Sequence, residues 1–439
     1  MYCHGMALND TGVPPMNKTK SLCCSIFLLP WLPVSGADVV VPNDTASRET
    51  LRLSSEESTL RLAGMDIFPH ASGTVLYDDN VTIGHTNQID DVIWKVAPGI
   101  TITGGDVGAY LPGAVTLEQL RSFLYYSLVD DVSKPGRFFG FDYTPSLNFY
   151  TDHSQFNDVG HSVKFTGGYA LTRLALGLDF DMNREQLKNN SVGTLTKVAN
   201  YDTRLRALYD FNDRTSAEVG ARYRRTDYEV EGYQGYQEVS NENWLNRKFA
   251  DRLSLGLGMG VGRVIPQNSE SQTFEQGLVR AVYRLSGKLF LSSAVGMEFR
   301  QYDSGESGTV NPVVAVSGTY QLREGTTLNL EGHRREQPTV TGGYNSTQMG
   351  AILGVRQLLF SRLYAGASAG YDNVKYNGTE RNLSSARSDD YLFGRLTFDY
   401  EFNRHFTGTI YYNYFRDNSS EDQFSYDNNL LGLQLRWHL

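Results

Sequence analysis

Long segments in which apolar residues alternate with glycine or polar residues recur from about residue 137 onward. In residues 253–262, every second residue from Leu253 to Val261 is leucine, methionine or valine, and the residues between them are serine or glycine. Such a period of two predicts β-strands with one apolar face. The segments are about ten to fourteen residues long, whereas strands in soluble sheets usually contain about five or six. About 9–11 residues suffice for a tilted strand to cross a bilayer, so these lengths favour membrane-crossing strands.

The sequence contains eighteen such segments. Bacterial single-chain barrels have an even number of strands, so this number predicts a closed barrel. From the fourth strand onward, short connections alternate with mostly longer loops rich in Asn, Ser, Gly and Asp, such as 185–196, 229–237 and 377–385. Short turns face the periplasm and long loops face outside, so both chain ends are expected on the periplasmic side. The predicted fold is all-β: a closed antiparallel transmembrane β-barrel of about 18 strands. The predicted strands are 71–80, 90–102, 137–151, 157–169, 172–184, 197–209, 215–228, 238–249, 252–264, 272–284, 287–302, 309–321, 326–337, 343–356, 361–376, 386–401, 404–417 and 424–437.

A tyrosine, followed two residues later by leucine or phenylalanine and then by a short polar turn, recurs five times. The intervals are 40, 74, 37 and 80 residues, which correspond to one or two copies of a hairpin-sized unit. Aromatic side chains at one level are typical of the belt at a membrane–water interface. The predicted periplasmic aromatic girdle consists of Tyr169, Tyr209, Tyr283, Tyr320 and Tyr400.

Residues 1–37 are predicted to be a leader or signal peptide, with Met1 or Met16 as the start. Two lysines follow Met16, residues 22–34 form an apolar core, and Ser35-Gly36-Ala37 resembles a small-residue cleavage site. The apolar core is too short for a membrane-spanning helix, which needs about 20 residues.

All three cysteines, Cys3, Cys23 and Cys24, lie in this leader, so the mature chain has no disulfide, thiolate metal site or cysteine nucleophile. The whole chain has a formal net charge of −9 and the leader carries +1, so the mature chain carries −9 − 1 = −10. Nucleic-acid binding is not expected, because phosphate contacts need clustered Lys and Arg. No cofactor and no metal site is predicted.

Two segments depart from the strand pattern. Residues 38–70 are polar and charged, and are expected to form a periplasmic N-terminal segment or a plug. Residues 103–136 replace an expected tight turn as a periplasmic insertion. Within it, residues 116–119 resemble a helix cap before an amphipathic stretch, which predicts a short helix. That helix would cover the barrel mouth, contact a periplasmic partner, or be a tolerated insertion.

Ionisable residues in the strands lie opposite the apolar face, since an Arg or Lys facing lipid at the bilayer centre costs about 2–4 kcal/mol. In a water-filled lumen they would influence which solutes pass. The alternative is that they only pair across strands and hold the wall. The proposed pore-lining residues are Lys164, Asp179, Asp181, Arg206, Glu218, Arg222, Arg224, Glu298, Arg300, Glu331, His333, Arg335, Arg356, Arg395, Asp399 and Arg436.

Other patterns have a structural explanation that we favour over a chemical one. His333 lies between carboxylates, but no serine is tied to it by sequence, so catalysis is not predicted and the chain is not expected to be an enzyme. The pairs Asp78-Asp79, Asp90-Asp91 and Asp389-Asp390 lack the spacing of a known calcium loop. Tyrosines are more often girdle residues than a track for sugar rings. The alternating glycines of 256–262 would receive a packed segment or widen the pore.

The start of the barrel resembles the beta-barrel porin 2 family of outer-membrane proteins. The residues that carry the resemblance are the segment from Gly73 to Asn80, which contains Tyr77-Asp78-Asp79-Asn80, followed by Val92-Ile93 and Ala97-Pro98-Gly99. The resemblance implies the outer membrane of a Gram-negative bacterium, and an association with exopolysaccharide gene sets.

Two features depart from the family pattern. The insertion at 103–136 has no counterpart, and the chain ends in Leu439 where barrel assembly signals usually present an aromatic residue. Trp437 and the apolar alternation partly preserve that signal for the barrel assembly machinery.

The first functional hypothesis is an outer-membrane, porin-like channel for passive diffusion of small polar solutes, with outer-membrane lipids around it. The second is the barrel component of exopolysaccharide secretion, which would dock a periplasmic partner. The third is a soluble exported β-propeller, because a unit near 40 residues also fits a four-stranded blade. Against the propeller, each unit contains two long strands rather than four short ones.

Overall fold

The computed structural model describes residues 60–62, 64–105, 136–230, 232–285, 288–305, 308–339, 344–378 and 387–439. These residues form a β-barrel with two short 3-10 turns, η1 (Ser154–Phe156) and η3 (Asp422–Phe424). The strands are β1 (Leu60–Leu62), β2 (Met65–Asp78), β3 (Asp91–Gly105), β4 (Gly136–Tyr150), β5 (Asp158–Ala170), β6 (Leu174–Asn189), β7 (Thr194–Asn212), β8 (Thr215–Tyr228), β9 (Tyr236–Ala250), β10 (Leu253–Pro266), β11 (Gln272–Leu285), β12 (Leu289–Tyr302), β13 (Thr309–Arg323), β14 (Thr326–Pro338), β15 (Tyr344–Phe360), β16 (Leu363–Gly378), β17 (Ser388–Glu401), β18 (Phe406–Ser419) and β19 (Tyr426–His438).

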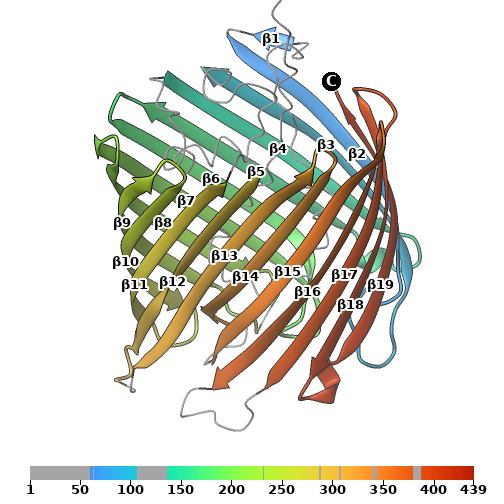
Figure 1. Cartoon of the computed structure of the whole chain (residues 1–439). Coiled ribbons are helices and arrows are strands. Elements are labelled where there is room, and N and C mark those ends of the chain that lie inside the picture. Colours follow the sequence, from blue (N-terminus) through green and yellow to red (C-terminus); the bar gives the residue numbers. More distant parts are fainter. Residues whose placement is uncertain are drawn as a thin grey trace, which may run out of the picture.

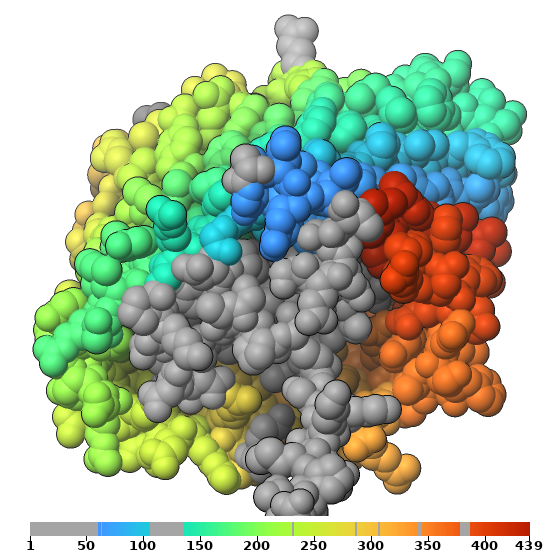
Figure 2. Space-filling view, turned by 90° about the horizontal axis from the view of Figure 1, so that it is seen from above, coloured from blue at the N-terminus to red at the C-terminus, as the bar shows by residue number. Residues whose placement is uncertain are grey.

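Each strand from β2 to β19 pairs antiparallel with the next strand along the chain. The ring closes where β19 pairs with β2, from Leu430 opposite Asp78 to His438 opposite His70. Figure 1 shows the tilted strands, with β1 and the C-terminus at the same end of the barrel. Viewed from that end, the first strands (blue) lie beside the last (red) (Figure 2). The predicted closed 18-strand barrel is confirmed.

Two predicted boundaries differ most from the structure. The barrel begins at Met65 instead of residue 71, and Met65 pairs with Gly104. Pro69 obscured this start, because proline inside a run argues against a strand. Of residues 185–196, predicted as a loop, 185–189 and 194–196 instead extend β6 and β7. The leader, most of 38–70 and the helix expected within 103–136 lie outside the described residues and stay predictions.

The outward face of the wall is apolar. Leu257, Met259 and Leu433 are 66%, 70% and 57% exposed, whereas the glycines between Leu257 and its neighbours on β10 are buried. No helix in the described ranges is long and apolar enough to cross a membrane. Because the apolar face surrounds the barrel and the polar face is enclosed, lipid contact on the outside is the arrangement that leaves least apolar surface in water.

The glycine stripe of β10 makes room for large side chains of the adjacent strands. A Cβ on Gly258 would lie 2.6 Å from Cε3 of Trp244 on β9, and one on Gly262 would lie 2.3 Å from Cζ of Phe274 on β11. Arg280 of β11 covers the Trp244 ring, with its guanidinium carbon 4.3 Å from the ring centroid. The stripe therefore lets aromatic rings of the adjacent strands lie against the inner face of the wall.

This packing predicts that Gly258→Ala destabilises the barrel. The new methyl group must displace Trp244, and overpacking of this kind costs about 1–3 kcal/mol. The matched control is Gly277→Ala on the outward face, where a Cβ meets no atom within 4 Å. Urea unfolding in lipid vesicles measures both. Equal stability of the two variants would contradict the close packing of Trp244 against Gly258.

Candidate functional site: the barrel interior and its mouth

All sixteen proposed pore-lining residues occupy strand positions that alternate with the outward residues of their own strands. Lys164 of β5 lies directly opposite Asp181 of β6, and Glu331 of β14 is half-buried on the same stripe as His333. Arg395 lies over the ring of Tyr411, 5.6 Å from its centroid. The ion-pair and hydrogen-bond partners given below for the other proposed pore-lining residues are inward side chains on the same strand or on nearby strands.

A cationic cluster lines β6 to β8. Asp202 of β7 accepts hydrogen bonds from Arg204 at 2.8 Å and from Nε of Arg222 at 2.8 Å. Arg206 donates to Asp179 at 2.6 Å. Asp202 and Arg204 were missed by the sequence analysis, although both share the alternation with Arg206 and so carry the same signal.

On either side of the glycine stripe, buried arginines bind carboxylates. Glu218 binds Arg280 at 2.8 Å, and Arg224 binds Glu238. Arg280 and Glu238 also escaped the sequence analysis. The Glu218–Arg280 contact runs from β8 to β11 across the stripe, whereas Arg224 and Glu238 join the neighbouring strands β8 and β9 on one side of it.

Arg300 of β12 is the most enclosed cation of this kind, with 2% exposure. It binds Glu298 at 2.7 Å and lies 4.0 Å from Glu336 of β14. It also donates to Gln272 at 2.8 Å. Arg300 and Glu298 therefore face inward as predicted, and the contacts of Arg300 link β12 to β11 and β14.

A third group lies on β14 to β19. His333 Nε2 is 3.0 Å from Asp372 of β16, and Arg335 donates to Gln348 at 2.6 Å. Asp399 lies 3.8 Å from Arg356 and 3.9 Å from Arg436. The partner of His333 is thus a carboxylate of the wall.

The predicted girdle tyrosines lie at the end of the barrel with the short turns. Tyr169, Tyr209, Tyr320 and Tyr400 are between 39% and 48% exposed, and Tyr283 is half-buried. Tyr209 and Tyr400 each meet the phenylalanine two residues later edge to face, at 5.3 and 5.1 Å between ring centroids.

At the opposite end, the tip of the β6–β7 hairpin leaves the wall. Pairing of β5 with β6 stops at His161 opposite Arg184, and pairing of β7 with β8 stops at Val198 opposite Tyr228. Beyond these points β6 and β7 pair only with each other, as far as Asn189 opposite Thr194. We call residues 185–197 the mouth hairpin.

The mouth hairpin is buried against strands on the other side of the ring. Lys188 is 3% exposed, and its Nζ binds Asp78 of β2 at 2.7 Å and donates to Asn428 of β19 at 2.9 Å. At the tip, Ser191 Oγ is 3.2 Å from the hydroxyl of Tyr376 on β16, and Tyr426 donates to Asn190 at 2.7 Å. The hairpin therefore lies across the mouth.

Loop 79–90 packs against the inner face of β17 to β19 at the same mouth. Ile83 is 1% exposed and belongs to a cluster with Tyr391, Phe415 and Leu430. Asn80 is fully buried and bonds across to the backbone of Asp427 at 3.0 Å.

The acidic pairs considered for calcium have protein partners. Asp91 accepts backbone N–H bonds from Thr151 and His153, both at 2.9 Å, and Asp389 binds Arg387 at 2.7 Å. No group of three metal-ligating side chains occurs in the part of the chain that the structure describes.

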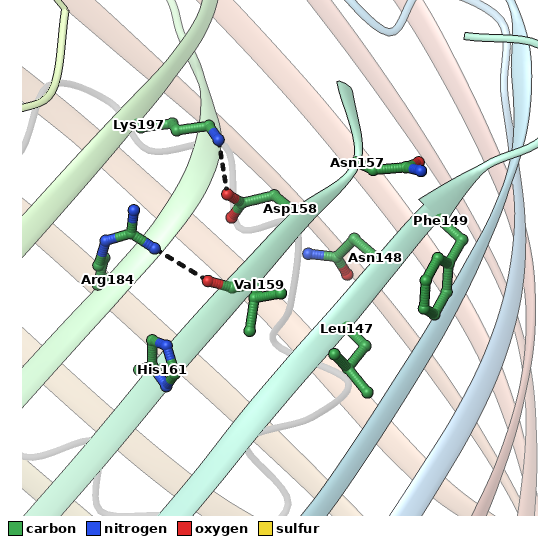
Figure 3. Close-up of a pocket in the computed structure, with 9 residues that line it drawn as sticks. All are labelled: Leu147, Asn148, Phe149, Asn157, Asp158, Val159, His161, Arg184 and Lys197. Atoms are coloured by element: carbon green, nitrogen blue, oxygen red, sulfur yellow. Dashed lines mark hydrogen bonds and ion pairs between the residues drawn. The ribbon is translucent and has the colours of Figure 1, made fainter. Parts of the chain in front are cut away.

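A pocket of about 310 Å³ marks the place where the mouth hairpin leaves the wall. Figure 3 shows the two contacts that fasten its base: Lys197 binds Asp158 at 2.9 Å, and Arg184 donates to the carbonyl of Val159 at 3.0 Å. Arg184 also binds Glu229, which lies beyond the end of β8, and the hydrogen bond lowers the pKa of that carboxyl.

Comparison with known families bears on what kind of barrel this is. Residues 284–439 match the family model described as "Putative beta-barrel porin 2". This match confirms the family resemblance, and it lies at the opposite end of the chain from the residues that first indicated it. An apolar outer band on a closed barrel and a porin family model agree on an outer-membrane protein. No curated protein matches the chain.

Three solved structures align with most of the chain at low identity. OpdQ of Pseudomonas aeruginosa aligns with a TM-score of 0.45 and 10% identity, over 86% of this chain and 99% of its own. OccAB4 of Acinetobacter baumannii aligns with a TM-score of 0.44 and 8% identity, over 86% and 99%. OccK1 (OpdK) of Pseudomonas aeruginosa aligns with a TM-score of 0.43 and 10% identity, over 85% and 99%.

Proposed function

We propose that this protein is a porin-like channel for passive diffusion of small polar solutes across the outer membrane of a Gram-negative bacterium. The observation that carries the proposal is a closed 18-strand ring with an apolar exterior and a charged interior. Barrels of sixteen to eighteen strands enclose an aqueous channel unless they are plugged. No catalytic role is proposed: the histidine considered for catalysis, His333, lies 3.0 Å from the wall carboxylate of Asp372, and no serine is tied to it by sequence.

The proposal extends to how the protein reaches its membrane. Residues 1–37 would direct export and be removed, and the barrel assembly machinery would insert the mature chain. The family resemblance supports a polysaccharide or a small polar solute as the transported molecule. Segments 38–70 and 103–136 are the candidates for contact with a periplasmic partner.

Liposome swelling tests the function. Vesicles that contain the purified barrel should swell in small neutral sugars, at rates that fall as the sugar grows, and protein-free vesicles should not. Absence of swelling and of single-channel current, both in the parental barrel and in a variant that lacks residues 185–197, would overturn the channel.

The β6–β8 cluster predicts an effect on ion selectivity. Asp202→Asn leaves Arg204 and Arg222 without their shared carboxylate, so the reversal potential in a salt gradient should shift toward that of the anion. Asp427→Asn, which removes the same charge from an exposed position beside Arg416, is the matched control. An equal shift in both variants would show that Asp202 does not face the permeation path.

A further inference from the structure

We infer that the mouth hairpin, residues 185–197, is a gate of this channel, held closed by a latch at Lys188 and a second contact at Arg387. The inference rests on the proposed channel function and adds its regulation. Solutes would pass when the hairpin lifts from the far wall.

The hairpin is a unit that can move without disturbing the barrel. Its two strands pair with the neighbouring strands only up to Arg184 and from Val198 onward. Beyond these positions the described residues form no further β-ladder with it, and one backbone hydrogen bond, from the N–H of Glu229 to the carbonyl of Lys197 at 2.9 Å, lies at its base. Two side-chain contacts at its base, Lys197 with Asp158 and Arg184 with the carbonyl of Val159, lie at the hinge (Figure 3). Lifting the tip therefore leaves the eighteen-strand ring intact.

The hairpin reaches a nearly opposite part of the ring. In the order of pairing, β6 and β16 are separated by β2 to β5 and β17 to β19 in one direction, and by β7 to β15 in the other. The contact between Ser191 and Tyr376 joins these two sides. A segment that joins opposite walls narrows the passage between them.

The contacts of Lys188, the latch, define the closed position of the hairpin at a small net cost in free energy. Its ammonium group bonds both oxygens of Asp78, the carbonyl of Asn80 at 2.9 Å and the side-chain oxygen of Asn428. Burial of an ion pair loses hydration that roughly offsets the attraction gained. When the tip lifts, both ions regain water, so the open and closed states differ less in free energy than the number of contacts suggests.

The second contact fastens the turn of the hairpin. Arg387, just before β17, donates to the carbonyls of Ser191 at 2.9 Å and Asn190 at 3.3 Å. Its guanidinium lies over the rings of Tyr376 and Phe424, with its carbon 4.0 and 3.8 Å from their centroids. Since Asp389 also binds it, Arg387 stays on the wall when the hairpin leaves.

A reversible cross-link tests the gate. The described barrel contains no cysteine, so Asp78→Cys with Lys188→Cys introduces one addressable pair. Without a cross-link this variant should show several-fold higher single-channel conductance than the parental barrel, because the latch is absent. A short, reducible bifunctional thiol reagent should return the conductance to the parental level or below, and reduction should restore the high level.

The matched control pair is Lys375→Cys with Ser388→Cys, which lie directly opposite each other on β16 and β17. This pair also loses one lysine at the same end of the barrel, and its conductance should not respond to the reagent. Heat-modified gel mobility verifies that every variant is folded. Parental conductance in the latch variant, or no change on cross-linking, overturns the gate while the channel stands. Absence of current in all variants overturns the channel itself.

Discussion

Met259→Arg should prevent most of the protein from inserting as a folded barrel. Met259 is 70% exposed at the middle of β10, and an arginine facing lipid at that depth costs about 2–4 kcal/mol. The folded fraction recovered in lipid vesicles, measured by heat-modified gel mobility and urea titration, gives the size of the effect.

The control for this prediction is the same substitution on the opposite face at the same height. Gln276 of β11 lies opposite Gly260 and bonds Glu298 at 2.6 Å. An arginine there would face the interior beside a carboxylate, so Gln276→Arg should fold nearly as well as the parental chain. Equal losses in the two variants would mean that the two faces of the wall do not differ in environment.

Arg300→Met should lower the free energy of unfolding by about 3–5 kcal/mol, the usual cost of removing one partner of a buried ion pair. The reason is that Glu298 and Glu336, 3% and 7% exposed, would be left without their cation. Urea unfolding in vesicles measures the change.

The double variant Arg300→Met with Glu298→Gln separates this cause from a simple packing defect. Removing one of the two uncompensated charges should recover part of the lost stability, because the costly elements are the buried carboxylates. A double variant as unstable as the single one would show that the methylene stem of Arg300, and not its charge, stabilises the wall.

The wall of the barrel could be predicted from the sequence because its signal is local. The strand expected at 215–228 has the same bounds in the structure, since alternation and turn residues are properties of neighbouring positions. For the same reason the alternation predicted that the side chains of Glu298 and Arg300 face inward. It could not give their partners, because the contact between Arg300 and Glu336 depends on the distance between β12 and β14.

The mouth hairpin could not be predicted from the sequence, because its contacts also join residues that are far apart in the chain. The run Lys188-Asn189-Asn190 is typical of a solvated loop, and nothing nearby in the chain indicates burial. The burial of the hairpin depends on Asp78, 110 residues before Lys188, and on Tyr376, 185 residues after Ser191. Such contacts appear only when the ring closes and brings the ends of distant strands to one mouth.

The central claim is that the apolar face of the wall touches hydrocarbon while the charged face lines an enclosed interior. Spin labels on single cysteines at Leu205 and Val219, which are outward and 55% and 53% exposed, and at Arg206 and Arg222, which are inward, test it directly. In vesicles, the first two labels should collide with molecular oxygen and little with a water-soluble nickel complex, and the other two should show a much lower oxygen-to-nickel ratio. Labels at Leu205 and Val219 that are shielded from both reagents would place these side chains in a dry protein centre and contradict the account.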